Sequence, residues 1–99
     1  MNVCCIRCTL DPHRIADFES YAAIWPPIIA RCGGRLLGYI LPHLGANNFA
    51  QALIGFDSLA AYERYRETLL NDDDAIANFA DAARTRCTLV EERCFLLPA

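Results

Sequence analysis

The sequence lacks the features that point to a membrane or nucleic-acid role. No apolar stretch approaches the roughly 18 residues that a membrane-spanning helix needs, so we expect no membrane span. Lysine is absent, the 9 basic residues are scattered arginines, and the formal net charge is −3. Because nucleic-acid binding depends on clustered basic charge, we also expect no nucleic-acid partner.

Signals for secretion and for catalysis are also missing. The N-terminal residues lack the basic segment followed by an apolar segment that is typical of a signal peptide. We therefore expect a cytoplasmic protein whose 6 cysteines stay reduced. No Ser-His-Asp set, paired carboxylates or histidine-ligand spacing stands out. Catalytic residues are thus unknown from the sequence, and we expect no metal site and no cofactor.

What is present is a short chain rich in apolar residues. Its 99 residues predict one domain over residues 1–99. Hydrophobic residues make up 55% of the chain, above the roughly 45–50% of typical soluble domains. A small domain has little interior volume, so some apolar surface is expected to be buried outside its own core.

Hydrophobic patterns predict four strands, over residues 3–10, 35–41, 48–56 and 87–97. A first helix is expected to begin with Asp11 as N-cap and Pro12 as its first residue. Pro26-Pro27 should kink or divide it, and Gly33-Gly34 should end it.

A second helix is expected after Asp57 or Ser58, with its buried side formed by Leu59, Tyr62, Leu69 and Leu70. The "NDDD" segment (71–74) interrupts this helix, and its acids suit the capping of a resumed helical stretch. That stretch is expected to bury Ile76, Phe79 and Ala83.

The resulting order, β-α-β-β-α-β, predicts an α+β ferredoxin-like sandwich with a four-stranded antiparallel sheet. Two helices cover only one face of such a sheet. Yet the first three strands place apolar residues at consecutive positions, as strands buried on both faces do. The simplest cover for the second face is the same face of a second copy, and we expect a symmetric homodimer.

The stretch "VCCIRC" (3–8) raises the question of a metal or redox centre. On an extended strand, Cys5 and Cys8 point to opposite faces. Cys4 and Cys8 share a face but lie roughly 13 Å apart, too far for one zinc ion. Structural packing is the favoured interpretation. Cross-strand proximity of Cys4 to Cys94 and of Cys8 to Cys87 remains an open alternative.

Several segments together resemble the NIPSNAP family of small dimeric α/β-barrel proteins, over nearly the whole chain. The most specific are Pro27-Ile28 before Gly33-Gly34, the Gly38-Tyr39 pair, Asn48, the Asp57-Ser58-Leu59 helix start and Glu92 before the terminal "LLPA". The matching stretches are "TLDP", "RCGGRLLGY", "GANN", "GFDSLAAYERYRETLL" and "EERCFLLPA".

The resemblance implies a subunit whose sheet packs on a partner's sheet as a dimeric α/β barrel. Its function is unassigned in most bacterial members, and the wider superfamily includes cofactor-free monooxygenases, lactone isomerases and haem enzymes. The chain departs from the family pattern where polar, aromatic or histidine residues are usual. Those positions hold Val3, Cys4, Ile6, Cys8, Cys32, Ala52 and Ile54.

The candidate ligand-binding residues are the polar side chains of the strands and strand ends: Tyr39, His43, Gln51, Arg7 and Glu92. The leading hypothesis is a homodimer that binds a small apolar or aromatic ligand between its sheets. Two alternatives are a non-catalytic dimerisation or interaction module and a cofactor-free monooxygenase or isomerase. A further alternative is thiol-based metal or redox sensing.

Overall fold

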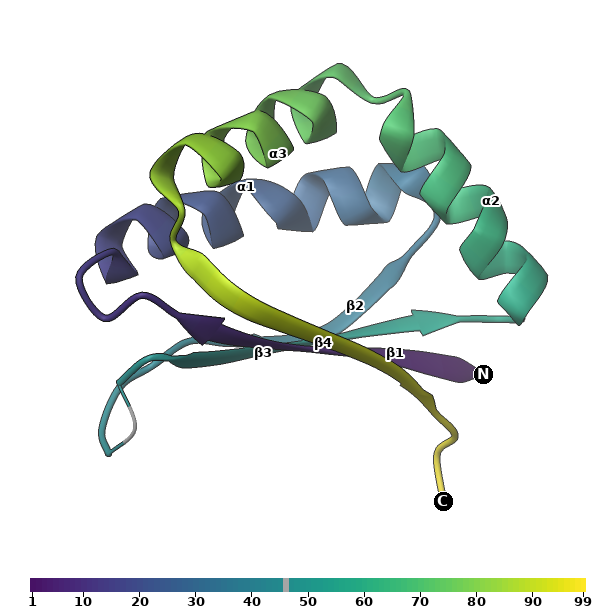
Figure 1. Cartoon of the computed structure of the whole chain (residues 1–99). Coiled ribbons are helices and arrows are strands. Elements are labelled where there is room, and N and C mark those ends of the chain that lie inside the picture. Colours follow the sequence, from purple (N-terminus) through teal and green to yellow (C-terminus); the bar gives the residue numbers. More distant parts are fainter. Residues whose placement is uncertain (46) are drawn as a thin grey trace.

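The computed structural model describes residues 1–45 and 47–99. The stretch "GANN", which carries part of the family resemblance, includes Ala46, which lies outside the described residues. Four strands form one antiparallel sheet in the order β2-β3-β1-β4, so the predicted α+β sheet is confirmed (Figure 1). The elements in chain order are β1 (Asn2–Leu10), α1 (Ile15–Cys32), β2 (Arg35–Ile40), β3 (Phe49–Phe56), α2 (Leu59–Leu70), α3 (Asp73–Thr85) and β4 (Thr88–Leu96).

The helical layer has three helices where two were expected, and all three lie on one face of the sheet (Figure 1). The chain stops being helical at Asn71 and starts again after Asp72, whose side chain accepts a hydrogen bond of 3.0 Å from the amide of Ala75. An N-cap carboxylate of this kind begins a new helix. The "NDDD" segment therefore separates two helices, with Asp73 and Asp74 in the first turn of α3.

The N-cap expected for α1 is wrong, and so is the division of this helix at its prolines. Asp11 does not cap the helix, because its carboxylate accepts the amide of His13 and its carbonyl accepts the amide of Arg14, which makes a separate turn before Ile15. Pro26-Pro27 does not divide the helix, which is continuous through both residues. The two missing amide donors are outweighed by burial of the apolar side of the helix, which includes residues on either side of the prolines.

The other predicted helix ends hold. Gly33 caps α1 in the left-handed conformation with φ of 106°, a backbone region that glycine adopts without strain. Ser58 is the N-cap of α2 and accepts the amide of Ala61 at 3.0 Å.

The buried sides of α2 and α3 differ from those expected. Tyr65 and Leu69 are the buried residues of α2, whereas Leu59 and Leu70 are exposed. In α3 the buried positions are Ala75, Asn78 and Thr85, whereas Ile76 and Ala83 are exposed and Phe79 is half-buried. The positions of hydrophobic residues do not show which side of a short helix is buried, because packing against α1 and the sheet decides which side faces inward.

The sheet separates two environments. Side chains alternate along a strand, so Cys4, Cys8 and Leu10 of β1 face the helices and are buried with the core residues of α1 and β3. We call the other side of the sheet the open face. It carries Val3, Cys5, Arg7 and Thr9 of β1, Leu37 and Ile40 of β2, Phe49, Gln51, Leu53 and Gly55 of β3, and Val90, Glu92, Cys94 and Leu96 of β4.

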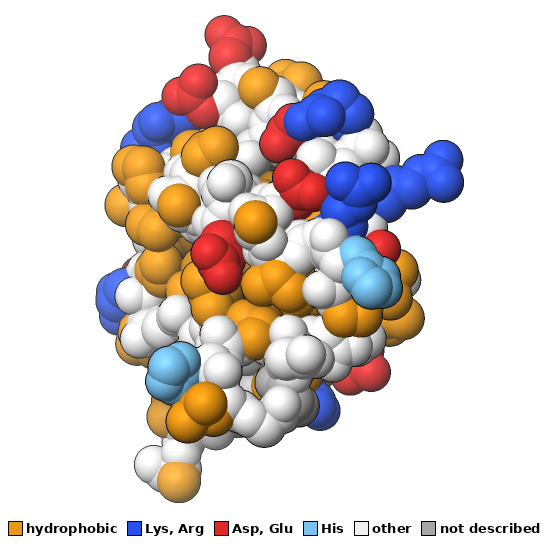
Figure 2. Space-filling model, turned by 90° about the vertical axis from the view of Figure 1, so that its left-hand side faces the viewer, with side chains coloured by type: hydrophobic (Ala, Val, Ile, Leu, Met, Phe, Trp, Pro, Cys, Tyr) orange, Lys and Arg blue, Asp and Glu red, His pale blue; other side chains and the backbone are white. Residues whose placement is uncertain are grey.

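Much of the open face is apolar and exposed. Ile40 is 65% exposed, and Val90 and Leu96 are each more than half exposed. Exposed hydrophobic side chains also gather on one end of the molecule, among acidic and basic ones (Figure 2). The apolar excess of the sequence is therefore found largely outside the core of the single chain.

Candidate functional site

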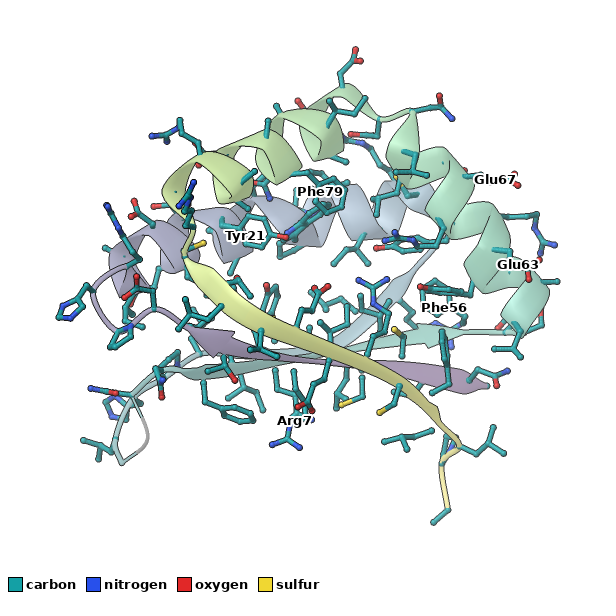
Figure 3. The ribbon with its side chains drawn as sticks, viewed as in Figure 1. Arg7, Tyr21, Phe56, Glu63, Glu67 and Phe79 are labelled. Atoms are coloured by element: carbon teal, nitrogen blue, oxygen red, sulfur yellow. The ribbon has the colours of Figure 1, made fainter. Side chains whose placement is uncertain are left out.

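A cavity of about 70 Å³ lies between the helices and the sheet. Tyr21 of α1, Phe79 of α3 and Phe56 of β3 extend into this space from its roof and floor (Figure 3). The sequence predicted a ligand between the sheets of two subunits, whereas this cavity lies within one chain, on the other side of the sheet. Its volume is below that of a cavity of roughly 150 Å³ that holds benzene and far below that of drug-sized ligand pockets, so at most a single small ring fits.

Aromatic rings form a large part of the cavity wall. Trp25 stands between Tyr21 and Phe79, with ring centroids at 5.7 Å and 4.9 Å respectively. On the α2 side, the ring of Phe56 lies 5.2 Å from Tyr62 and 4.9 Å from Tyr65. Such tilted and edge-on arrangements are favourable for aromatic pairs, so the wall is well defined without a bound molecule.

The cavity opens beside β4. The residues of β4 after Thr88 are exposed, yet Glu91 and Arg93 of this strand line the cavity. Arg93 Nη1 donates a hydrogen bond of 2.8 Å to Tyr62 Oη, and its other terminal nitrogen lies 3.6 Å from a carboxylate oxygen of Glu91. β4 therefore contributes one acidic and one basic group to the cavity, and Arg66 of α2 adds a second arginine to its lining.

The polar groups deeper in the cavity are protonated at neutral pH. Burial raises the pKa of Tyr21 to about 12 and that of the Cys8 thiol to about 11. Burial also raises the pKa of Tyr39 and of Cys4. These side chains can donate hydrogen bonds to a ligand, but the two thiols are poor nucleophiles because little thiolate forms.

The structure divides the five predicted site residues among three places. Tyr39 lines the cavity. Arg7 and Glu92 are register partners on β1 and β4 and lie on the open face, where Arg7 points away from the helices (Figure 3). The amide of Gln51 also lies on that face and donates to Cys5 Sγ at 3.0 Å. His43 is exposed, beyond the end of β2.

On the open face, Arg7 has a defined partner. Its guanidinium lies 5.1 Å from the ring centroid of Phe49, a cation–π contact. The side chains of Arg7, Gln51 and Glu92 therefore share the open face. Gln51 also belongs to the lining of the cavity, as Tyr39 does, whereas the sheet separates Arg7 and Glu92 from it.

Sequence reasoning missed most of the cavity residues. Tyr21 and Trp25 are four positions apart on one helix face, a spacing that could have identified them as a pair. Side chains alternate between the two faces of a strand. Glu91 and Arg93 of β4 are therefore expected on one face of the sheet, and Glu92 on the other. The sequence alone does not say which of the two sets faces the helices.

The cysteine register differs by one residue from the predicted proximity. Cys94 lies opposite Cys5, and Cys4 lies opposite Phe95. Cys8 and Cys87 are buried in the same core cluster. Within the described residues, no group of three or more His, Cys, Asp or Glu side chains is placed to hold a metal ion.

A comparison with family models decides the family. The model named NIPSNAP matches residues 5–99. The chain belongs to the NIPSNAP family. No functionally curated protein matches this NIPSNAP chain. Among the residues that the structure describes, no helix is both long and apolar enough to cross a membrane.

Solved structures support the fold of this NIPSNAP domain. A NIPSNAP family protein with unknown function from Agrobacterium tumefaciens is 20% identical, with a TM-score of 0.86 over 100% of this chain and 88% of that chain. An uncharacterized NIPSNAP domain protein from Burkholderia xenovorans is 22% identical, with a TM-score of 0.79 over 100% and 95% of the two chains. A putative antibiotic biosynthesis monooxygenase from Nitrosomonas europaea is 8% identical, with a TM-score of 0.75 over 99% and 98%.

Proposed function

We propose that residues 1–99 act as a single domain that binds a small aromatic or apolar molecule in the cavity beneath its helices, as half of a cytoplasmic homodimer. The aromatic-walled cavity that opens beside β4 carries this proposal. Ligand sites are typically concave and mostly apolar, with a few polar groups that fix orientation. Here the hydroxyls of Tyr21 and Tyr39 and the charged pair at the entrance supply those polar groups.

The ligand class follows from the wall and the entrance. Rings such as Trp25 and Phe79 favour a planar ligand, which stacks or meets them edge-on. Glu91 accepts a hydrogen bond and Arg93 donates one, so a ligand with a single hydroxyl can be held by either group. A small hydroxylated aromatic molecule therefore fits the site best.

The test uses phenol, a single aromatic ring with one hydroxyl group. Trp25 is the only tryptophan of the chain and lines the cavity, so its emission reports on occupancy, and calorimetry gives the affinity independently. Ala52→Leu adds bulk to a small buried residue of the cavity floor. Ala60→Leu makes the same change on the exposed side of α2 and serves as its control.

We expect phenol to bind the wild-type chain and Ala60→Leu with equal affinity, and Ala52→Leu at least about tenfold more weakly. Circular dichroism of each variant checks that the fold is kept. Equal binding to all three proteins, or no binding to the wild-type chain, would overturn the proposed site.

The homodimer is proposed from the open face. Monomers rarely leave extended apolar patches on the surface, and a two-fold axis lets one patch cover its own copy. The apolar residues of the face surround Arg7 and Glu92, whose opposite charges can pair across such an axis. A second copy would thus cover both the hydrophobic and the charged parts of this face.

An oxygen-dependent enzyme is a second candidate. It is suggested by the shared fold with the Nitrosomonas europaea protein and by Glu91, whose carboxylate at the entrance can accept a proton from a bound hydroxyl. Oxygen uptake with phenol that is lost in Glu91→Gln would support it. Binding of phenol without oxygen uptake would leave the domain as a binding module.

A further inference from the structure

The cavity between the helices and the sheet has more basic than acidic groups in its lining. Arg66 of α2 and Arg93 of β4 are basic, Glu91 of β4 is acidic, and the other lining side chains are apolar or uncharged. Partly buried charges are usually paired. A neutral ligand would leave this excess positive charge in place, whereas a ligand with one negative charge would balance it.

Arg93 is directed into the cavity with most of its donors free. Its side chain is 27% exposed, and Nη1 donates to Tyr62 Oη at 2.8 Å. The carboxylate of Glu91 lies 3.6 Å from Nη2, which is too long for a hydrogen bond. Because a guanidinium has five N–H donors, Arg93 can bind a further acceptor without losing Tyr62.

Arg66 adds a second guanidinium next to the same tyrosine. It is half-buried and follows Tyr62 by four positions on α2, so the two side chains are neighbours on one helix face. Within residues 1–45 and 47–99, Arg66 has no carboxylate partner in an ion pair. Burial raises the pKa of Tyr65 to about 12, and Arg93 and Arg66 both act against this rise. Both positive charges therefore act at one end of the cavity.

The acidic group acts on the other end. Glu91 lies opposite Cys8 of β1, whereas Arg93 lies opposite Ile6. Burial is the main cause of the raised pKa of Cys8 and of Tyr21, and the Glu91 carboxylate contributes to both. The cavity is thus negative on the side of α1 and positive on the side of α2. An anionic group on a bound ring would be drawn to the α2 side.

We propose that the ligand of this cavity is a single-ring aromatic carboxylate, such as benzoate or a hydroxybenzoate, whose carboxylate is bound by Arg66 and Arg93. Guanidinium groups suit a carboxylate because they donate two parallel hydrogen bonds to it. A ring hydroxyl can still donate to Glu91. The inference rests on the proposed binding cavity and adds the charge of its ligand. The site lies on the helix side of the sheet, so a second copy on the open face would not cover it.

The test compares benzoate with benzamide, a neutral molecule of nearly the same shape, at neutral pH. Trp25 emission and calorimetry give both affinities. Arg66→Gln and Arg93→Gln each remove one guanidinium of the site. Arg64→Gln removes the same charge from an exposed position of α2 and serves as the matched control. Circular dichroism of each variant checks that the fold is kept.

We expect the wild-type chain and Arg64→Gln to bind benzoate at least about tenfold more tightly than benzamide, because hydrogen bonds between charged groups are the stronger ones. In Arg66→Gln and Arg93→Gln this preference should fall below about threefold. Added sodium chloride should weaken the binding of benzoate to the wild-type chain and leave that of phenol nearly unchanged.

The possible failures separate this inference from the cavity on which it rests. If phenol binds the wild-type chain but benzoate binds no better than benzamide, the carboxylate site is refuted and the binding cavity stands. A preference for benzoate that persists in both Arg66→Gln and Arg93→Gln would also overturn the site. If none of the three molecules binds, the cavity and this inference are refuted together.

Discussion

Arg31, in the last turn of α1, donates to both carboxylate oxygens of Asp72, the N-cap of α3, at 2.8 Å and 2.7 Å. The same guanidinium contacts Asp74 at 2.8 Å, and Asp72 also accepts the amide of Ala75. One carboxylate therefore begins α3 and ties it to α1. Because both helices supply rings to the cavity wall, this contact supports the roof of the candidate site.

Replacing this carboxylate should destabilise the fold. In Asp72→Ala the N-cap and the two-bond contact with Arg31 are both lost, and we expect the melting temperature to fall by about 5 °C. Asp57→Ala is the control, since Asp57 meets Arg35 at 3.5 Å and is highly exposed. The control should melt like the wild-type chain in thermal circular dichroism. Equal losses in both variants would contradict a special role for Asp72.

The same contact predicts how stability depends on pH. The hydrogen bonds from Arg31, followed by that from Ala75, lower the pKa of Asp72 to about 2. A lowered carboxylate pKa stabilises the folded state above the ordinary pKa near 4, and this contribution is lost as the pH falls towards 2. Wild-type melting temperatures should therefore fall more steeply below about pH 4 than those of Asp72→Ala. Parallel curves would show that the lowered pKa is not a source of stability.

Gly34 and Gly38 should respond differently to the same added methyl group. A Cβ at Gly34 would lie 2.9 Å from Ile29 Cγ2 and 3.0 Å from Ile54 Cγ2, whereas one at Gly38 meets no described atom within 4 Å. Both isoleucines are buried and branched at Cβ, so neither methyl can move aside easily. Gly34→Ala should lower the unfolding free energy in urea by about 1–3 kcal/mol, and Gly38→Ala should leave it nearly unchanged.

A charge on the open face should separate the proposed dimer. Leu53→Glu places a carboxylate in the central part of that face, while Ile24→Glu places one on the exposed side of α1, where Ile24 is 46% exposed. Light scattering should show a dimer for the wild-type chain and for Ile24→Glu, and a monomer for Leu53→Glu. A wild-type monomer would refute the dimer directly.

The sequence predicted the sheet well because its first three strands contain short continuous apolar runs, and such runs bounded by turn residues are typical of buried strands. All four strands are close to their expected ranges, and Ser58 and Gly33 act at the ends where capping rules place them. The predictions that were wrong concern positions where local backbone preferences compete with tertiary packing. Pro26 and Pro27 are local helix breakers, yet the helix continues because its buried side is fixed by the sheet.

The candidate site was only partly predictable, because the sequence does not show which side of each strand faces the helices. Alternation shows that Arg7 and Glu92 can share a face, but it does not show which face the helices cover. Glu91, Glu92 and Arg93 are consecutive polar residues on an exposed strand, so no hydrophobic contrast distinguishes the two sides. Only the packing of the helices reveals that Glu91 and Arg93 belong to the cavity.

β4 therefore contributes to two surfaces with alternate residues. Glu91 and Arg93 border the cavity, while Glu92 and Cys94 lie on the open face. A point substitution in this strand can change one surface and leave the other intact. Insertion of one residue within it would instead rotate the following side chains by half a turn and exchange their surroundings. The strand can thus tolerate changes of residue type more readily than changes of length.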